Sequence, residues 1–319
     1  MSRLAFVFRI LLYGWLLAIG ALFAIVVRRL RYEFSGDDSR DARASPFPCV
    51  PIREPAFVKP DPLIYAQYYL SSLGFAVTWD NPDIELRLNG QAVSSSDLQK
   101  DTGYQVVARI SNASLFAPVV QMPVSLSYLD FGIGTVRIPI GSTKIDLGVL
   151  GGPNHPAFAV IPWHTPKQEG HYCLLVELEP FDDLNFFNNL GQENTNVGLA
   201  HSPADFAFTL RNDTQRRHTY RLEPDAYVIP EPLPCDDREL TERERQERAA
   251  RHRRGGHPVP HGWHVEIVPD MANLEPEESI TIKVAITPPP SFNGKQPINV
   301  NAFHEQGLAG GVTLNVVVN

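Results

Sequence analysis

Alternation of apolar and polar side chains recurs along most of the chain, and it restricts the possible folds more than any other feature. Ile84, Leu86 and Leu88 share one face of an extended segment, while Glu85 and Arg87 take the other. Such period-two alternation is typical of β-strands with one buried face. The pattern returns at residues 104–110, 124–128, 172–178, 206–210, 263–267, 280–286 and 312–318. We therefore predict that the body of the chain is all-β.

Turn-forming residues separate these segments. Clusters of proline, glycine, asparagine and aspartate occupy residues 80–82, 89–90 and 151–154, and such clusters mark chain reversals. The chain contains 28 prolines and 22 glycines, a composition that favours many turns over long helices. Short alternating segments between turns indicate a β-sandwich. The length of 319 residues suits two such domains, which we predict at residues 63–200 and 201–319.

An uncharged apolar run lies near the N-terminus. Residues 10–27 read ILLYGWLLAIGALFAIVV, eighteen positions without a charged side chain. A helix of this length covers roughly 27 Å, close to the thickness of the hydrocarbon core of a bilayer. Arg9 precedes the run, and Arg28, Arg29 and Arg31 follow it, so arginines can reach the headgroups on both sides. We predict a retained transmembrane helix rather than a cleaved signal peptide, because no small-x-small cleavage site follows within reach.

The segments that flank this run do not decide its orientation. The N-terminal tail, residues 1–9, carries Arg3, Arg9 and the α-amino group, so the positive charges on the two sides nearly balance. On the other side, residues 28–62 form a linker in which prolines recur from position 46 onward. Such a composition favours extended polyproline geometry. We expect this linker to be a semi-rigid spacer between the membrane and the first sandwich.

Overall charge and cysteine usage exclude some classes of protein. The net charge of −8 and the pI near 5.7 argue against a general nucleic-acid binder, which usually has a basic face. Three cysteines are too few for a disulfide framework. Cys173 lies in an apolar strand pattern, and we expect it to pack as a small hydrophobic residue. Cys49 and Cys235 lie in proline-rich connectors, where they either form a disulfide or stay free.

Residues 235–262 form a charged insertion in the second sandwich. Its first part, residues 235–256, reads CDDRELTERERQERAARHRRGG, with acids at the beginning and arginines at the end. This order suits the dipole of a helix, and acid-before-base pairs four residues apart support it. The segment has almost no apolar face, so a helix here would be solvated. We therefore interpret the segment as an exposed charged region, either a solvated helix or disordered, and a contact site for a partner protein or an anionic surface is the alternative.

Motifs that would identify an enzyme are missing from the sequence. It contains no Gly-x-Ser-x-Gly elbow, no His-Glu-x-x-His pair and no Walker-type phosphate loop. Residues 132–134 contain two glycines between strand segments, and we interpret them as a turn. His252, His257, His261 and His264 lie in a segment rich in glycine and proline, where nothing fixes the geometry that a metal site needs. We therefore expect a protein without catalytic activity or cofactor, although a hydrolase site stays an alternative if the fold brings His164, His171 and the turn at Asp182 together.

A second group of polar residues has two open interpretations. Asp182, Asp183, Asn185 and Asn188 offer hard oxygen atoms close together in sequence, and such atoms can hold calcium. The same residue types also form tight turns, because their side chains bond to nearby backbone groups. The sequence predicts one of these two roles for the four residues.

Residues 166–197 resemble a known family. They read PKQEGHYCLLVELEPFDDLNFFNNLGQENTNV, in which Gly170 enters a strand, Asp182 and Asp183 turn the chain, and Asn188 leads into the next strand. This segment resembles the closing hairpin of CARDB-type (cell-adhesion-related) immunoglobulin-like domains of bacterial and archaeal surface proteins.

The second half resembles related bacterial immunoglobulin-like modules. The resemblance rests on residues 262–263, 288–289 and 310–314. It implies two tandem immunoglobulin-like sandwiches, each with seven strands and no cofactor, that serve as spacer, adhesion or protein-contact units. It also implies an extracytoplasmic body, either periplasmic or on the cell surface.

Together these features predict a single-pass membrane protein of a bacterial envelope. We expect its sandwiches to contact another protein, as a scaffold or as an accessory subunit of a membrane complex. Lipid through residues 10–27 and one or more proteins are the expected partners, with a second copy of the chain as a further possibility and no nucleic acid. A surface adhesion or glycan-binding module is the main alternative function.

Overall fold

The computed structural model describes residues 58–319 except for residues 131, 198–204, 231–240, 306 and 319. These residues belong to one compact unit, Pro55–Asn319. Several predictions lie outside the described residues: the tail 1–9, the transmembrane helix 10–27, its arginines Arg9, Arg28, Arg29 and Arg31, most of the linker 28–62, and Cys49 and Cys235. In the part that is described, no helix has the length and apolar character needed to cross a bilayer.

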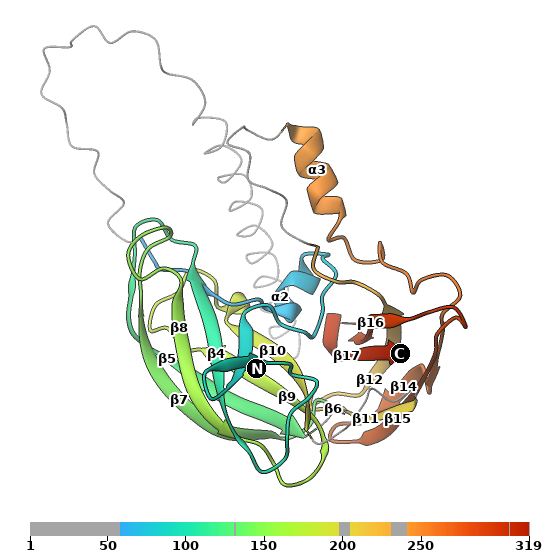
Figure 1. Ribbon diagram of the computed structural model, residues 1–319. Coiled ribbons are helices and arrows are strands. Elements are labelled where there is room, and N and C mark those ends of the chain that lie inside the picture. Colours follow the sequence, from blue (N-terminus) through green and yellow to red (C-terminus); the bar gives the residue numbers. More distant parts are fainter. Residues whose placement is uncertain (1–57, 131, 198–204, 231–240, 306, 319) are drawn as a thin grey trace, which may run out of the picture. The chain divides into compact units, whose positions relative to one another are not determined.

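Two antiparallel sheets form the first sandwich (Figure 1). One has the order β1-β4-β2-β3, with β8 also paired to β4. Its strands are β1 (Pro62–Leu63), β2 (Ile84–Leu88), β3 (Gln91–Val93), β4 (Gly103–Asn112) and β8 (Ala157–His164). The other has the order β10-β9-β5-β7. Its strands are β5 (Val119–Asp130), β7 (Arg137–Leu147), β9 (Gly170–Leu178) and β10 (Leu190–Val197). With five strands in one sheet and four in the other, this sandwich has more than the seven strands that the family resemblance implies.

The predicted alternation places side chains from both sheets in one core. In β4, Tyr104, Val106 and Ile110 are buried, and Leu126 of β5 and Leu174 of β9 pack in the same cluster. Sheets that share an apolar layer of this kind form a sandwich. The predicted turn at residues 89–90 is also confirmed, since both residues have positive φ between the paired strands β2 and β3, as a two-residue hairpin requires.

The second sandwich is again built from two sheets. One has the order β13-β15-β11-β6 and the other β14-β12-β16-β17. The strands are β6 (Gly132–Ile133), β11 (Asp205–Arg211), β12 (His218–Asp225), β13 (His264–Val268), β14 (Met271–Leu274), β15 (Ser279–Thr287), β16 (Gly294–His304) and β17 (Gly307–Val318). Phe208, Ile282 and Val284 of the first sheet pack against Val300 and Leu314 of the second. The predicted alternation at 206–210, 280–286 and 312–318 therefore fills this core.

Strand β6 corrects the interpretation of residues 132–134 as a turn. Gly132 and Ile133 pair in parallel with Thr209 and Leu210 of β11, so a segment from the first half of the chain completes a sheet of the second sandwich. Ile133 is buried in the second core. A Cβ atom on Gly132 would clash with the carbonyl oxygen of Thr209. Glycine is therefore needed at position 132 because the two strands approach closely there, and not because the chain turns.

A fully buried tryptophan joins the two sandwiches. The indole Nε1 of Trp79 donates to Asn301 Oδ1 at 2.9 Å, and its backbone N–H donates to Thr313 Oγ1 at 2.9 Å. The ring lies so close to Gly311 that a Cβ atom there would clash with it. We call the contacts of β6 and of Trp79 with the second sandwich the junction.

Helix α2 (Gln67–Ser72) lies beside the junction. Because it contacts both β10 and β17, it packs against both sandwiches. The ring of Tyr68 meets Trp79 edge to face, with 5.9 Å between centroids.

In strand β9 of the first sandwich, Cys173 and Leu175 are buried on the outer face of their sheet. Strand β9 is thus covered on both faces, which explains its continuous apolar run.

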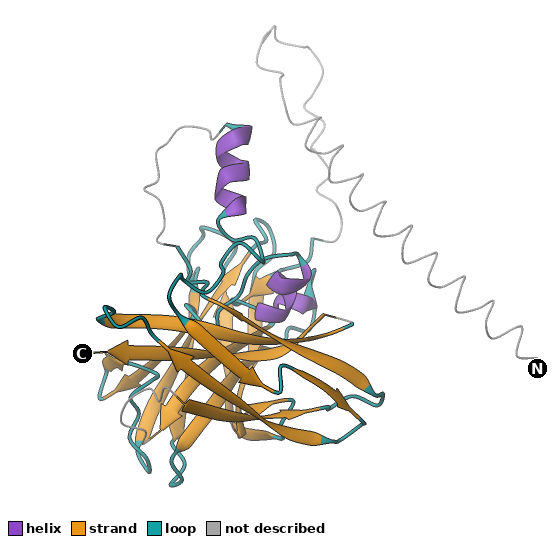
Figure 2. Ribbon diagram, turned by 90° about the vertical axis from the view of Figure 1, so that its right-hand side faces the viewer, coloured by secondary structure: helices purple, strands orange, loops and turns teal. Residues whose placement is uncertain are grey.

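The charged insertion contains helix α3 (Glu242–Ala250), which is the helical one of the two conformations that the sequence left open. Thr241 and Glu244 form a reciprocal capping box at its start, which satisfies two free backbone donors. Arg243 pairs with Glu247 four residues later at 2.7 Å. Figure 2 shows this helix standing clear of the sheets.

Candidate functional site

Three loops meet at one end of the first sandwich. They are residues 113–118 between β4 and β5, residues 148–156 between β7 and β8, and residues 179–189 between β9 and β10. Because successive strands run antiparallel, these connections fall at the same end. The backbone N–H of Leu150 donates to the carbonyl of Ser114 at 2.8 Å, which links the first two loops directly.

Large apolar side chains point outward from these loops. Phe181 is fully exposed, and Phe116 and Phe187 are each 71% exposed. The set comprises Leu115, Phe116, Leu150, Phe181, Leu184, Phe186 and Phe187, and we call it the loop-end surface. Single exposed apolar residues are common, whereas large exposed patches usually mark interaction sites.

Residues just before β1 tie these loops together. The backbone N–H of Leu184 donates to the carbonyl of Pro60 at 2.8 Å, and that of Ala113 donates to the carbonyl of Asp61 at 2.9 Å. The side-chain amide of Asn188 donates to the Asp61 carboxylate at 2.9 Å. The segment that leads from the predicted linker into the body is therefore held between two of the loops that carry the loop-end surface.

Asn112 fixes the loop bases from inside. It is fully buried, and its side-chain oxygen accepts from the backbone N–H groups of Asp61 and Ser114. Its amide donates to the carbonyls of Ala117 and Gly148. One side chain thus links the chain before β1 with two loops, so the exposed aromatic residues stand on a hydrogen-bonded base.

The four residues of the calcium hypothesis lie in the third loop. Asp183 accepts from the backbone of Asn185 at 3.0 Å and from the amide of Asn189 at 2.6 Å. Asp182 forms an ion pair with Lys59 at 2.6 Å, and Asn185 caps the short helix η1 (Phe186–Asn188). Their side chains therefore hold the turn, and calcium binding stays a prediction.

Acidic groups dominate the charge at this end of the sandwich. Five carboxylates lie on or beside the loops, and two lysines accompany them: Asp61, Asp146, Glu179, Asp182 and Asp183 with Lys59 and Lys144. Lys59 is paired with Asp182. The surface is thus apolar with a slightly acidic rim, unlike the basic amphipathic surfaces that bind anionic lipid.

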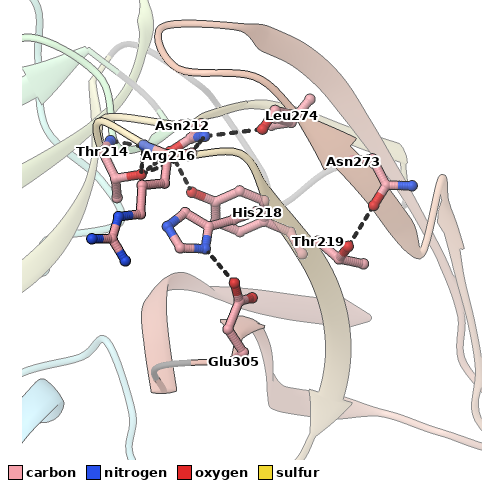
Figure 3. Close-up of polar contacts among 9 residues, drawn as sticks. Asn212, Thr214, Arg216, His218, Thr219, Asn273, Leu274 and Glu305 are labelled. Carbon is pink, nitrogen blue, oxygen red and sulfur yellow. Dashed lines mark hydrogen bonds and ion pairs between the residues drawn. The ribbon is translucent and has the colours of Figure 1, made fainter. Parts of the chain in front are cut away.

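A second cluster occupies one end of the second sandwich. His218 begins β12, His304 ends β16, and Glu305 follows in the turn to β17. Figure 3 shows the His218 ring directed at the Glu305 carboxylate, and Nδ1 and Oε1 are 2.8 Å apart. The two imidazoles stack with 4.6 Å between centroids. Within the part of the chain that is described, one donor atom from each of these three side chains lies within 4.8 Å of the other two.

Neighbouring groups fix this histidine–carboxylate cluster. His218 is only 3% exposed, and Tyr220 meets His304 edge to face at 5.6 Å. The Tyr220 hydroxyl bonds to the buried side chain of Asn212 at 3.1 Å. Desolvation and the nearby His218 lower the pKa of His304, whereas hydrogen bonds lower the pKa of Glu305. These directions favour the neutral form of His304 and the ionised form of Glu305.

Buried carboxyl groups lie near the junction. Burial raises the pKa of Glu193 well above its usual value, although the carboxylate accepts from the backbone N–H of Asn81. Burial also raises the pKa of Asp80 and of Asp225. All three have internal partners: Asp80 accepts from the amide of Asn315, and Asp225, which is partly exposed and lines a cavity, accepts from the amides of Asn299 and Asn301. We therefore assign them to the fold rather than to catalysis.

The predicted histidine segment is dispersed in the structure. His252 shares a hydrogen bond with the Tyr227 hydroxyl at 2.7 Å, and the His257 ring contacts the same tyrosine at 4.8 Å between centroids. His264 is exposed at the start of β13. The sequence reasoning missed His218 and His304, which are far apart in the chain and are brought together by strand pairing.

Residues considered for a catalytic site or a thiol role are also separated or buried. His164 ends β8 and pairs with Asp101 at 3.0 Å, at the opposite end of the first sandwich from Asp182. Burial lowers the pKa of His171 to about 4. Burial also raises the pKa of the Cys173 thiol to about 12, so this cysteine packs as a hydrophobic residue, as expected.

Comparison with known proteins gives similarity to solved structures alone. No family model and no curated protein matches the chain. A CARDB domain of Pyrococcus furiosus, solved in complex with di-metal ions, is 18% identical with a TM-score of 0.24, over 38% of this chain and 93% of that one. The C-terminal domain of Wzt is 9% identical with a TM-score of 0.25, over 43% and 87%. The adhesin InvE of Yersinia pseudotuberculosis is 12% identical with a TM-score of 0.20, over 70% and 56%.

Proposed function

We propose that this chain is a membrane-anchored, non-enzymatic envelope protein that binds another protein through the loop-end surface. The observation that carries this proposal is the set of exposed phenylalanines and leucines on three loops of one sandwich end. Protein interfaces place aromatic and apolar side chains at their centre and polar groups at their rim. Phe181, Phe186 and Phe187 supply such a centre, and Asp182 and Lys59 supply part of such a rim.

The place where the tether meets the body supports a partner in a membrane complex. Residues 60–61 bond to the loops that carry the loop-end surface, and the uncharged run 10–27 precedes them in sequence. The surface therefore lies at the end of the body where the described chain begins, and the proposed anchor precedes that point in sequence. Since its rim is acidic rather than basic, we favour a protein partner over anionic lipid.

A glycan-binding role has less support. It would use tryptophans exposed beside polar groups, yet Trp79 and Trp163 are buried in the packed interior. Trp263 packs edge to face on Phe292 at 4.7 Å. We therefore do not advance adhesion to a glycan as a second proposal.

Purification of the full chain from its membrane in mild detergent tests the proposal. The wild type is compared with the double variant Phe181→Asp/Phe187→Asp and with Val136→Asp, which changes a 65% exposed residue at the opposite end of the same sandwich. We expect one protein to accompany the wild type and Val136→Asp but not the double variant. A wild type that emerges alone as a monomer, or a partner that the double variant retains, would contradict the proposal.

A further inference from the structure

We propose that His218, His304 and Glu305 form a binding site for a borderline divalent transition metal, of which Zn²⁺ is the best representative. The site lies in the second sandwich, away from the loop-end surface, and does not depend on the proposed function. Two imidazoles and one carboxylate are a donor set that suits such ions. The donor atoms of all three residues lie within 4.8 Å of one another.

The strands bring these donors together with little freedom. β12 and β16 pair antiparallel, with Arg221 opposite Phe303, and continuation of this register puts His304 beside Tyr220. His218 lies two residues further along the same face of β12. Since the positions follow from strand pairing, the backbone needs no rearrangement to present the three side chains.

One pair of donor atoms in the cluster already lies close to the spacing of a tetrahedral site. Metal–ligand bonds of about 2.0–2.1 Å place neighbouring donor atoms about 3.3 Å apart. His218 Nδ1 and Glu305 Oε1 are 2.8 Å apart, so a metal between them requires a small separation. The imidazoles now stack with 22° between their planes. Binding therefore requires His304, which is partly exposed, to turn out of the stack toward the carboxylate.

Burial differs among the three residues in a way that fits a metal site. His218 is enclosed by the sandwich, with 3% of its side chain exposed, whereas Glu305 is 60% exposed. The buried imidazole is held in place before binding, and the exposed carboxylate marks the side from which an ion and a water ligand can arrive. Three protein ligands with one open position form a common zinc arrangement.

A zinc titration of the full chain tests the inference. The parent is the untagged protein with Cys49→Ser and Cys235→Ser, so that thiols outside the described residues do not compete. His304→Asn and Glu305→Gln are compared with His264→Asn, a control on an exposed histidine of β13. Affinity is measured by competition with a chromophoric chelator, and Co²⁺ absorption reports the coordination geometry.

We expect one saturable site, with affinity reduced at least tenfold by His304→Asn and by Glu305→Gln and unchanged by His264→Asn. The absence of a saturable site, or equal affinity in the parent and both cluster variants, would overturn the inference. A loss that His264→Asn shares would overturn it as well. If a variant does not fold, carbethoxylation of the parent decides: zinc must protect His304, and protection confined to other histidines rejects the site.

Discussion

The junction and the loop-end surface differ in how far their aromatic side chains are exposed to solvent. At the junction, Trp79 is fully buried, and both of its donors have partners in the second sandwich. At the loop end, Phe187 is 71% exposed and Phe181 is fully exposed. Both regions rest on well-bonded backbone, so the difference lies in what covers the aromatic rings.

This difference separates a contact made within the chain from one that is open to another molecule. The junction supplies shape and hydrogen-bond partners for Trp79, and close approach to Gly311 leaves no room for a side chain there. On the loop-end surface, Asn112 organises the loop bases while the rings above them stay in solvent. A buried apolar side chain contributes to folding stability, whereas an exposed one contributes to binding once a partner removes it from water.

The strongest test of the comparison removes the buried ring. We expect Trp79→Ala to lower the free energy of unfolding by about 3–5 kcal/mol, since it leaves a cavity and removes the donor to Asn301 Oδ1. Trp263→Ala is the matched control, because this ring is only partly buried, and we expect a loss of about 1 kcal/mol. Chemical denaturation measures both. Similar losses of unfolding free energy in the two variants would show that the buried Trp79 stabilises the fold no more than the partly buried Trp263 does.

Strand β6 gives a second test of the same region. Gly132→Ala should destabilise the protein by about 1–3 kcal/mol, because the new methyl group meets the Thr209 carbonyl. Gly141→Ala on β7 is the control, since a Cβ there makes only an ordinary contact with Ile161 at 3.5 Å. Thermal unfolding of both variants checks the prediction. If Gly132→Ala unfolds together with the control, β6 is not essential to the junction.

The buried carboxyl group of Glu193, near the junction, should make the stability of the fold depend on pH. Burial raises its folded-state pKa above the ordinary 4.5, so the folded state binds this proton more tightly than the unfolded state. The contribution of Glu193 to stability is therefore full below pH 4.5 and falls as the pH rises toward the raised pKa. We expect Glu193→Gln to weaken this decline and to be at least as stable as the wild type at neutral pH. Melting temperatures across pH measure it, and unchanged pH dependence would refute the assignment.

The smallest expected effect on stability belongs to the loop-end surface. Phe181→Asp and Phe187→Asp change exposed side chains, so we expect the free energy of unfolding to shift by no more than about 0.5 kcal/mol. Denaturation of each variant beside Trp79→Ala provides the measurement. A loss of several kcal/mol would mean that these rings stabilise the fold and are not reserved for a partner.

Local patterns in the sequence predict the regular parts of the fold. The alternation of Tyr104, Val106 and Ile110 identifies β4 and its buried face, and residues 89–90 identify a hairpin. The charge order of residues 235–256 is compatible with helix α3, although it does not distinguish a solvated helix from disorder. Each of these elements is determined by neighbours a few positions away, which is why the sequence alone is informative there.

Features that depend on distant pairing were missed or misread. β6 has two residues and finds its partner at Thr209 and Leu210, so no local pattern distinguishes it from a turn. The approach of His218 to His304 follows from the register of β12 and β16 in the same way. The loop-end surface had a visible signal in Phe181, Phe186 and Phe187, but exposure cannot be read from residue type when the neighbours are turn residues.

Site-specific photocrosslinking in intact cells tests the central claim most directly. A photoreactive phenylalanine analogue is placed at position 187 on the loop-end surface, and at position 136 at the opposite end as control. We expect a discrete crosslinked protein from position 187 and none from position 136. Crosslinks that are absent from position 187, or that are the same from both positions, would contradict the claim that the loop-end surface binds a protein partner.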